Sequence, residues 1–324
     1  EARSIAHTRT LELEVTPSVA GTLFSALDYL TSYPYGCTEQ TMSSFMPNIV
    51  VAQAMKKLQL PEAIDKKALD KKVEAGFERL QTLQHDDGGW GWWESDETDP
   101  FMTAYVAWGL KEAGEAGYHG SDYMAGKAGN AVRKQFDRPS AKTKADVRAW
   151  QLHALARMGK AEKGDLDAVW EKRGELTSLG WALMGLASQA MKDGRTQQIG
   201  LQLDVMAKRA GPYTWWPAER DIMLDFATDA STEATAFALK FMAIDDANSA
   251  SIAPAAKWLL SRRTQGARWQ STKQTAFAIF GLTEYLGRTK ELEPDFTARV
   301  TLNGREILKR SFTARDVFQK PVKI

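Results

Sequence analysis

The only cysteine of the 324-residue chain, Cys37, lies three positions before Gln40 and directly after the turn-like segment Tyr33-Pro34-Tyr35-Gly36. A helical pattern begins here, and residues three apart share one face of a helix, so the thiol and the side-chain amide should meet. Attack of the thiolate on the Gln40 amide carbon, with loss of ammonia, would give an internal thioester. A helix N-terminus stabilises an anionic sulfur, which predicts a lowered pKa for the Cys37 thiol. The alternative interpretation is an inert cysteine that packs as a small hydrophobic residue.

The segment Gly36-Cys37-Thr38-Glu39-Gln40 resembles the Gly-Cys-x-Glu-Gln thioester motif of the α2-macroglobulin and complement family. The flanking segments, Tyr33-Pro34-Tyr35 and Thr41-Met42-Ser43-Ser44-Phe45-Met46-Pro47, resemble the bacterial branch of that family. The resemblance implies a covalent trap for proteases. A protease cuts a bait segment elsewhere in the full protein, the thioester becomes exposed, and a lysine amine of the protease attacks the Gln40 acyl carbon. Because this acyl transfer happens once, we expect a protease inhibitor without cofactors and not an enzyme.

Four residues around the motif are candidates for supporting roles. A thioester must be kept away from water, and Tyr33 and Tyr35 are placed in the sequence to shield it, although aromatic packing is an equal alternative. Gly36 allows a tight turn and a close backbone approach. Glu39 either holds the loop or interacts favourably with the helix dipole.

His153 is a candidate for a further chemical role. Some members of the family use a downstream histidine to pass the acyl group to hydroxyls, and His153 follows Cys37 at roughly the expected distance. A histidine in a helix is more often packed or solvated, and without it amines should be preferred as nucleophiles. The four histidines are scattered without metal-ligand spacing, so no metal site is expected.

The composition excludes several other classes of protein. With 42 Lys and Arg against 41 Asp and Glu, the net charge of +1 argues against a nucleic-acid partner. No apolar run is long enough to span a membrane, and residues 1–20 lack a signal-peptide pattern, so this segment should not contact a membrane. The chain begins at Glu1, which suggests an excised fragment. The resemblance implies a periplasmic parent protein, lipid-anchored to the inner membrane, whose other domains would be partners of this one.

Helical periodicity runs through most of the chain. Apolar spacing predicts helices over 17–33, 38–60 and 62–84. A Thr-Ala-aromatic unit that follows a Trp-bearing turn recurs at 103–105, 235–237 and 275–277, which indicates stacked helix pairs. Further helices are predicted near 121–136, 142–158, 163–172, 176–192, 195–209 and 248–264. About twelve helices in six pairs fit a mainly α chain folded as a closed α/α toroid, which the resemblance also implies.

Both ends of the chain show strand signals. Residues 7–15 end in a polar–apolar alternation, and Asn303-Gly304 separates two strand-like runs at 296–302 and 305–312, which predicts a hairpin. Because a lone hairpin is marginally stable, 7–15 should pair with it. The resemblance implies that these strands come from an incomplete β-sandwich of the CUB type. The expected division is a CUB-like strand segment at 1–15, the toroid at 16–290 and a CUB-like hairpin segment at 291–324.

Two enzymatic interpretations and one binding interpretation compete with the thioester domain. The Gly-Trp loop at 85–93 could line a prenyl or sugar site of a terpene-cyclase-like toroid, although turn packing explains a recurring motif better. A carbohydrate-active toroid would need two carboxylates, for which the acids at 86–99 are candidates, although an acidic loop is usually solvated. The third alternative is a non-covalent binding module with an inert cysteine, and reactivity of Gln40 toward amines separates it from the thioester domain.

Overall fold

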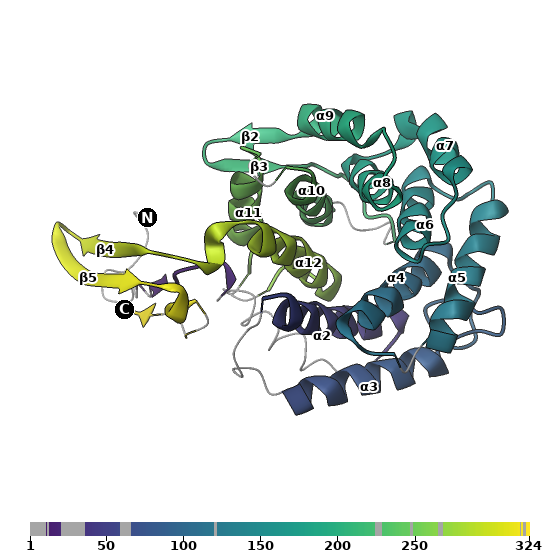
Figure 1. The fold of residues 1–324 in the computed structure, drawn as a ribbon, viewed down its shortest axis with the longest axis horizontal. Coiled ribbons are helices and arrows are strands. Elements are labelled where there is room, and N and C mark those ends of the chain that lie inside the picture. Colours follow the sequence, from purple (N-terminus) through teal and green to yellow (C-terminus); the bar gives the residue numbers. More distant parts are fainter. Residues whose placement is uncertain are drawn as a thin grey trace, which may run out of the picture.

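The computed structural model describes residues 11, 13–20, 36–58, 66–119, 122–223, 229–246, 249–264, 268–317, 319 and 322–324. In this part of the chain, eleven α-helices form two concentric rings (Figure 1). The inner ring contains α2 (Thr38–Leu58), α4 (Pro100–Ala116), α6 (Ala145–Arg157), α8 (Ser178–Met191), α10 (Ser231–Asp245) and α12 (Thr272–Arg288). The outer ring contains α3 (Lys66–Thr82), α5 (Asp122–Asp137), α7 (Lys163–Glu171), α9 (Thr196–Met206) and α11 (Ile252–Ser261).

The inner ring is closed. Each inner helix packs on the next one along the chain, and α12 packs on α2, while α3, α5, α7, α9 and α11 each pack on the inner helix that precedes them. The inner helices all run in the same direction, because residues from the C-terminal part of each line one common cavity. Their N-termini, including the start of α2 after Cys37, therefore lie at the opposite end. The predicted α/α toroid is confirmed.

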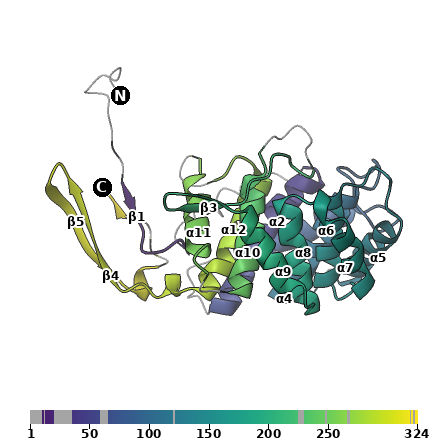
Figure 2. The same ribbon diagram turned by 90° about the horizontal axis from the view of Figure 1, so that it is seen from above.

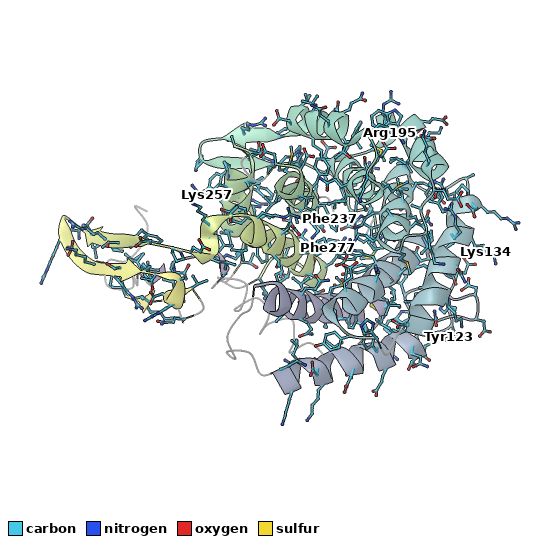
Figure 3. All side chains as sticks on the ribbon, in the orientation of Figure 1. Tyr123, Lys134, Arg195, Phe237, Lys257 and Phe277 are labelled. Atoms are coloured by element: carbon cyan, nitrogen blue, oxygen red, sulfur yellow. The ribbon has the colours of Figure 1, made fainter. Side chains whose placement is uncertain are left out.

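Aromatic side chains fill the centre of the ring. Phe237 of α10 and Phe277 of α12 lie edge to face, with ring centroids 5.0 Å apart, and Trp150 of α6 is 5.3 Å from Phe237. Figure 3 shows Phe237 and Phe277 inside the ring and charged or polar side chains such as Lys134 on its outside. The inner helices are apolar on nearly all sides because they contact neighbours all round, whereas the outer helices are amphipathic.

The repeated Trp–Thr unit is a structural device that joins an outer helix to the next inner helix. The buried Trp90 indole N–H donates to the carbonyl of Leu80 in α3 (2.8 Å), and the Trp90 backbone N–H donates to Thr103 Oγ1 in α4 (3.0 Å). The same pair of bonds recurs at Trp216 with Leu203 and Thr235, and at Trp269 with Leu259 and Thr275. Turn packing is thus the role of Trp90, which is too deeply buried to line a ligand site.

The terminal strands match the predicted hairpin, and the described end of its predicted partner at 7–15 pairs elsewhere. β4 (Phe296–Leu302) and β5 (Arg305–Phe312) pair through the turn Asn303-Gly304, where both residues have positive φ. β1 (Glu14–Val15) pairs with β6 (Val322–Lys323) and not with the hairpin, which stands apart from the ring in Figure 2. Most of the predicted strand at 7–15 and of the first predicted helix lies outside the described residues. The CUB-type sandwich and the domain boundaries stay predictions.

Residues 206–215 correct one helix boundary. Helix α9 ends at Met206, and the chain continues as a small hairpin of β2 (Lys208–Ala210) and β3 (Tyr213–Trp215), although a helix was predicted as far as 209. The turn contains Gly211, whose positive φ suits a tight connection. Three short 3₁₀ segments complete the described structure: Arg173–Glu175, Lys290–Leu292 and Ala314–Asp316.

Candidate functional site

The structure brings the side chain of Gln40 back onto the segment that contains Cys37. Cys37 immediately precedes the first residue of α2, and its backbone N–H donates a hydrogen bond to Gln40 Oε1 (3.2 Å). The Gln40 amide also lies against Gly36, since a Cβ at that position would be 1.9 Å from Oε1 and 3.1 Å from Cδ. Gly36 therefore provides the space that the amide occupies, which gives its expected role in close approach a concrete form.

Backbone and hydroxyl groups hold the first turn of α2 in place. The Thr38 N–H donates to the carbonyl of Trp92 (2.9 Å), so the 85–97 loop supplies an acceptor for a helix N–H that would otherwise lack one. Thr41 donates to the Cys37 carbonyl with both its N–H (3.0 Å) and its Oγ1 (2.9 Å). The backbone on both sides of Cys37 is thus fixed by neighbours near and far in the sequence.

Arg79, in the last turn of α3, is a member of the site that the sequence analysis missed. Its guanidinium donates to the Gly36 carbonyl from Nη2 (2.9 Å) and Nε (3.3 Å), and Nη1 forms an ion pair with Glu94 (3.0 Å). Nothing in the spacing of Arg79 along α3 marks it for this role, because the contact depends on how α3 packs beside α2.

The Cys37 side chain is buried, with 6% of the residue exposed. Burial raises the pKa of the Cys37 thiol above its ordinary value, and the nearby Glu39 carboxylate acts in the same direction. The backbone N–H of Gln40 lowers the pKa but does not outweigh the loss of solvation. The prediction of a lowered pKa from the helix N-terminus alone was therefore wrong, since it left out burial.

Glu39 points away from Gln40 and into the ring, where it links α2 to α12. Its carboxylate accepts hydrogen bonds from Ser43 (2.7 Å) and from Thr272 at the start of α12 (3.5 Å). Burial raises the pKa of Glu39, and the charge of Lys273 partly opposes this effect. These contacts join Glu39 to its own helix and to α12, and not to the loop before Cys37, so the role of Glu39 in holding that loop stays a prediction.

Beyond Glu39 lies a buried charged group that we call the Lys273 cluster: Lys273, Asp221 and Glu233. Lys273 forms ion pairs with Asp221 and with Glu233 (3.4 Å), and all three side chains are almost completely buried. Burial raises the pKa of Glu233 to about 7, and the nearby Asp221 contributes in the same direction. The cluster joins the starts of α10 and α12 at the same end of the ring as Cys37.

His153 lies in a different part of the molecule from the cysteine. Its ring packs against Trp108, Trp150 and Phe237, and it lines a cavity of about 550 Å³ together with Gln53 near the C-terminal end of α2. Cys37 is at the other end of that helix. Burial, aided by nearby cations, lowers the pKa of His153 to about 3, so the imidazole is neutral at pH 7. The fold does not bring His153 to Cys37, and its role in acyl transfer stays a prediction without support from the geometry.

The remaining candidates divide between the described and undescribed parts of the chain. Tyr33 and Tyr35 lie outside the described residues, so their shielding role stays a prediction. In the acidic loop, Asp96 accepts the backbone N–H groups of Trp92 and Trp93, and Asp99 caps the N-terminus of α4. These carboxylates have structural partners, which weakens the carbohydrate-active interpretation.

Membrane-spanning helices and metal-binding clusters are both absent from the described residues. None of the described helices combines the length and the apolar character that crossing a membrane requires. In the same residues, no group of three or more His, Cys, Asp and Glu side chains is arranged to hold a metal ion.

Sequence comparisons relate the chain to macroglobulins. Residues 11–132 match the family described as the A-macroglobulin TED domain. An α2-macroglobulin from Thermotoga maritima is 37% identical over 117 residues, which is 36% of this chain and 7% of the relative. The Escherichia coli α2-macroglobulin is 28% identical over 200 residues, covering 58% of this chain and 12% of the relative.

Structural comparisons agree on the fold over nearly the whole chain. A Salmonella α2-macroglobulin reacted with methylamine superposes with a TM-score of 0.67 at 23% identity, covering 96% of this chain and 20% of that one. A structure of native E. coli α2-macroglobulin, from domain MG7 to the C-terminus, gives the same TM-score and identity and covers 96% of this chain and 49% of that one.

The chain is thus similar to A-macroglobulin TED domains in the sequence of residues 11–132, which contains the Cys37–Gln40 turn, and to an α2-macroglobulin structure in its fold. Among these proteins, the chain is similar to the thioester domain of bacterial α2-macroglobulins. It spans only 7% and 12% of the length of the two curated relatives described above. It therefore corresponds to one part of proteins that are much longer.

Proposed function

We propose that this chain is the thioester domain of a bacterial α2-macroglobulin-like protease inhibitor, and that Cys37 and Gln40 form an internal thioester that captures proteases. The observation that carries the proposal is the folded-back Gln40 side chain, whose amide oxygen is 3.2 Å from the backbone nitrogen of Cys37. This contact holds the carboxamide beside the residue whose thiol would attack it.

The chemistry needs two acyl transfers. In the first, the Cys37 sulfur attacks Gln40 Cδ, the C–N bond breaks, and the nitrogen leaves as ammonia with the thiol proton. In the second, a primary amine attacks the same carbon, the C–S bond breaks, and Cys37 regains a thiol proton from the amine. The products are an amide at residue 40 and a free thiol. Since the thioester is consumed, the domain acts once and has no turnover.

Burial of the site supports a role as a latent acyl donor. A thioester hydrolyses when water reaches it, and Cys37 is almost fully buried in the described structure. Burial also raises the pKa of the free thiol, so Cys37 released by an amine would be mainly protonated at neutral pH.

The wider protein would supply the trigger and the location. A Salmonella α2-macroglobulin has been crystallised after reaction with methylamine, and an E. coli α2-macroglobulin has been crystallised after activation by trypsin. By similarity, we expect cleavage of a bait segment elsewhere in the parent protein to expose the thioester to a lysine of the protease. The proposed location is the periplasm, with the parent protein lipid-anchored to the inner membrane.

Intact mass spectrometry tests the proposal directly. The thioester form should have a mass one ammonia below that of the sequence and no free thiol. Methylamine should then add its own mass and release one thiol. A Cys37→Ala variant is the control, because it should keep the full sequence mass and ignore methylamine.

Three other outcomes are informative. A full sequence mass with a reactive thiol from the start would refute thioester formation and favour the binding module with an inert cysteine. A free thiol with the mass expected for Glu at position 40 would mean that the thioester formed and was hydrolysed. A full-length parent protein that forms the thioester but fails to become covalently linked to an added protease would refute the inhibitor role alone.

A further inference from the structure

The peptide group between Gly36 and Cys37 is hydrogen-bonded at both of its ends. Its carbonyl oxygen accepts two hydrogen bonds from the guanidinium of Arg79, at 2.9 and 3.3 Å. Its N–H, on the Cys37 side, donates to Gln40 Oε1 at 3.2 Å. Arg79, one peptide group and the amide oxygen of Gln40 therefore form a continuous chain of donors and acceptors that ends on the reacting carbonyl.

This series of hydrogen bonds is polarised from Arg79 toward Gln40. A guanidinium is a charged donor, and its hydrogen bonds are stronger than those of a neutral group. Two such bonds draw electron density toward the Gly36 oxygen, which makes the N–H of the same peptide a stronger donor through cooperative polarisation. The positive charge of Arg79 thus acts on Gln40 Oε1 through the intervening peptide, without touching the amide itself.

Acyl transfer at Gln40 Cδ creates negative charge on this oxygen. When a nucleophile adds to the carbonyl carbon, the C=O double bond opens and the oxygen becomes an oxyanion, which preorganised N–H donors stabilise more than they stabilise the ground state. We propose that the Cys37 backbone N–H is the oxyanion donor of the acyl transfers at Gln40, and that Arg79 is the positioning residue that orients and polarises it. The inference rests on the proposed thioester function.

Arg79 takes no proton and forms no bond in either acyl transfer. The nucleophile adds to Cδ, the electron pair of the C=O bond moves to Oε1, and the pair returns as the C–N or C–S bond breaks. The guanidinium stays charged throughout, and only the strength of the Cys37 N–H donor changes the barrier. Because it transfers no proton, Arg79 does not act as a general acid or base.

The other contact of Arg79 does not account for its position. Its ion pair with Glu94 joins partly exposed side chains, with 54% of the Glu94 side chain accessible to solvent, and such pairs contribute little to stability. The Gly36 carbonyl accepts from both Nε and Nη2, a two-donor geometry that a lysine cannot reproduce. The two bonds to the Gly36 carbonyl fix the guanidinium, whereas the ion pair with Glu94 is partly exposed, so Glu94 provides a matched control.

The experiment compares Arg79→Lys and Arg79→Met with Glu94→Gln, each purified in the thioester form. The readout is the second-order rate of thiol release by methylamine. Removing one oxyanion donor costs about 10² to 10³ in rate, and Arg79 acts one peptide away, so we expect a loss of about 10- to 100-fold in Arg79→Met. Arg79→Lys should lie between that variant and the unmodified chain, and Glu94→Gln should stay within about threefold of it.

A spectroscopic readout separates polarisation from a purely structural effect. With ¹³C placed at the glutamine side-chain carbonyl, the thioester C=O band in infrared difference spectra should move to higher frequency in Arg79→Met, because its hydrogen bond weakens. Glu94→Gln should leave the band in place. An unchanged band together with an unchanged methylamine rate in Arg79→Met would overturn the inference.

The result also distinguishes the two proposals from each other. Absence of a thioester in the unmodified chain refutes the proposed function itself. A thioester in the unmodified chain that reacts equally fast in both Arg79 variants refutes only the inference. If Arg79→Met folds with unchanged circular dichroism and melting but forms no thioester, while Glu94→Gln forms it, the inference is supported, because formation passes through the same oxyanion. If Arg79→Met fails to fold, the rate and band of Arg79→Lys decide the matter.

Discussion

Replacing Gly36 by alanine should slow thioester formation and leave the fold intact. The Cβ of an alanine at this position would lie 1.9 Å from Gln40 Oε1, whereas real Cβ atoms almost never approach a heavy atom closer than 3.0 Å. The amide oxygen must therefore move by about 1 Å, and a displacement of that size from a reactive geometry costs about 10²-fold in rate. This factor corresponds to about 3 kcal/mol in the activation free energy of thioester formation.

The rest of the structure should tolerate this substitution. Gly36 does not have a positive φ, so its backbone suits an alanine, and the atom that must move is at the end of a flexible side chain. Gly36→Ala should therefore melt within a few degrees of the unmodified chain, since a stability change of about 1 kcal/mol or less moves the melting temperature only slightly. The defect should appear in the chemistry and not in the fold.

The assay follows the loss of ammonia by intact mass after refolding from urea, with thiol release by methylamine as a second measure. The matched control is Gly126→Ala in α5, where an added Cβ would meet nothing within 4 Å and should stabilise the helix slightly. Gly126→Ala should form the thioester at the unmodified rate. If Gly36→Ala also forms it at that rate, the reasoning from the Gln40 contact is refuted.

Three further predictions concern the supporting structure. Trp90→Phe removes the indole donor from the buried Leu80 carbonyl and should lower the free energy of unfolding in urea by about 2–4 kcal/mol, whereas exposed Trp93→Phe should change it by less than about 0.5 kcal/mol. The folded-state pKa of Glu233 lies above its unfolded value, so the free energy of unfolding of the unmodified chain should fall as pH rises from about 4.5 to about 7. In Glu233→Gln this fall should disappear. His153→Ala should label with glycerol as efficiently as the unmodified chain, because the fold holds His153 away from Cys37.

Each of these predictions has an outcome that would contradict it. Equal losses in Trp90→Phe and Trp93→Phe would mean that the indole bond contributes nothing. A Glu233→Gln variant whose unfolding free energy follows the same pH curve as the unmodified chain would show that Glu233 does not bind the proton in this window. Reduced glycerol labelling in His153→Ala, with methylamine reactivity unchanged, would restore the histidine to the acyl-transfer mechanism.

The repeat and the hairpin show how much of the fold could be predicted from the sequence. The Thr-Ala-aromatic units predicted stacked helix pairs, and the bonds of Trp90 and Trp269 explain why these residues recur together. Trp216 makes the same pair of bonds, although a longer segment separates it from Thr235 than separates Trp269 from Thr275. The turn at Asn303 was readable because two residues with positive φ leave few choices of amino acid.

The partner of β1 and the end of α9 could not be predicted from the sequence in the same way. A strand of two residues, such as β1, carries too little periodicity to identify its partner, and its pairing with β6 depends on where the chain ends meet. The hairpin after Met206 interrupts a pattern that remains compatible with a helix, and the packing of β3 on α11 selects the strand. In both places, contacts distant in sequence override a weak local signal.

The sequence by itself determined the helices of the α/α toroid and the i, i+3 spacing of Cys37 and Gln40 at the start of one of them, because helical periodicity and residue spacing are local properties of the chain. Tertiary structure decided the environment of that pair. Arg79 reaches the Gly36 carbonyl only because α3 packs beside α2, and burial raises the Cys37 pKa that the helix terminus alone would have lowered. The position of His153, near the C-terminal end of α2 and away from Cys37, was likewise decided by packing and not by distance along the chain.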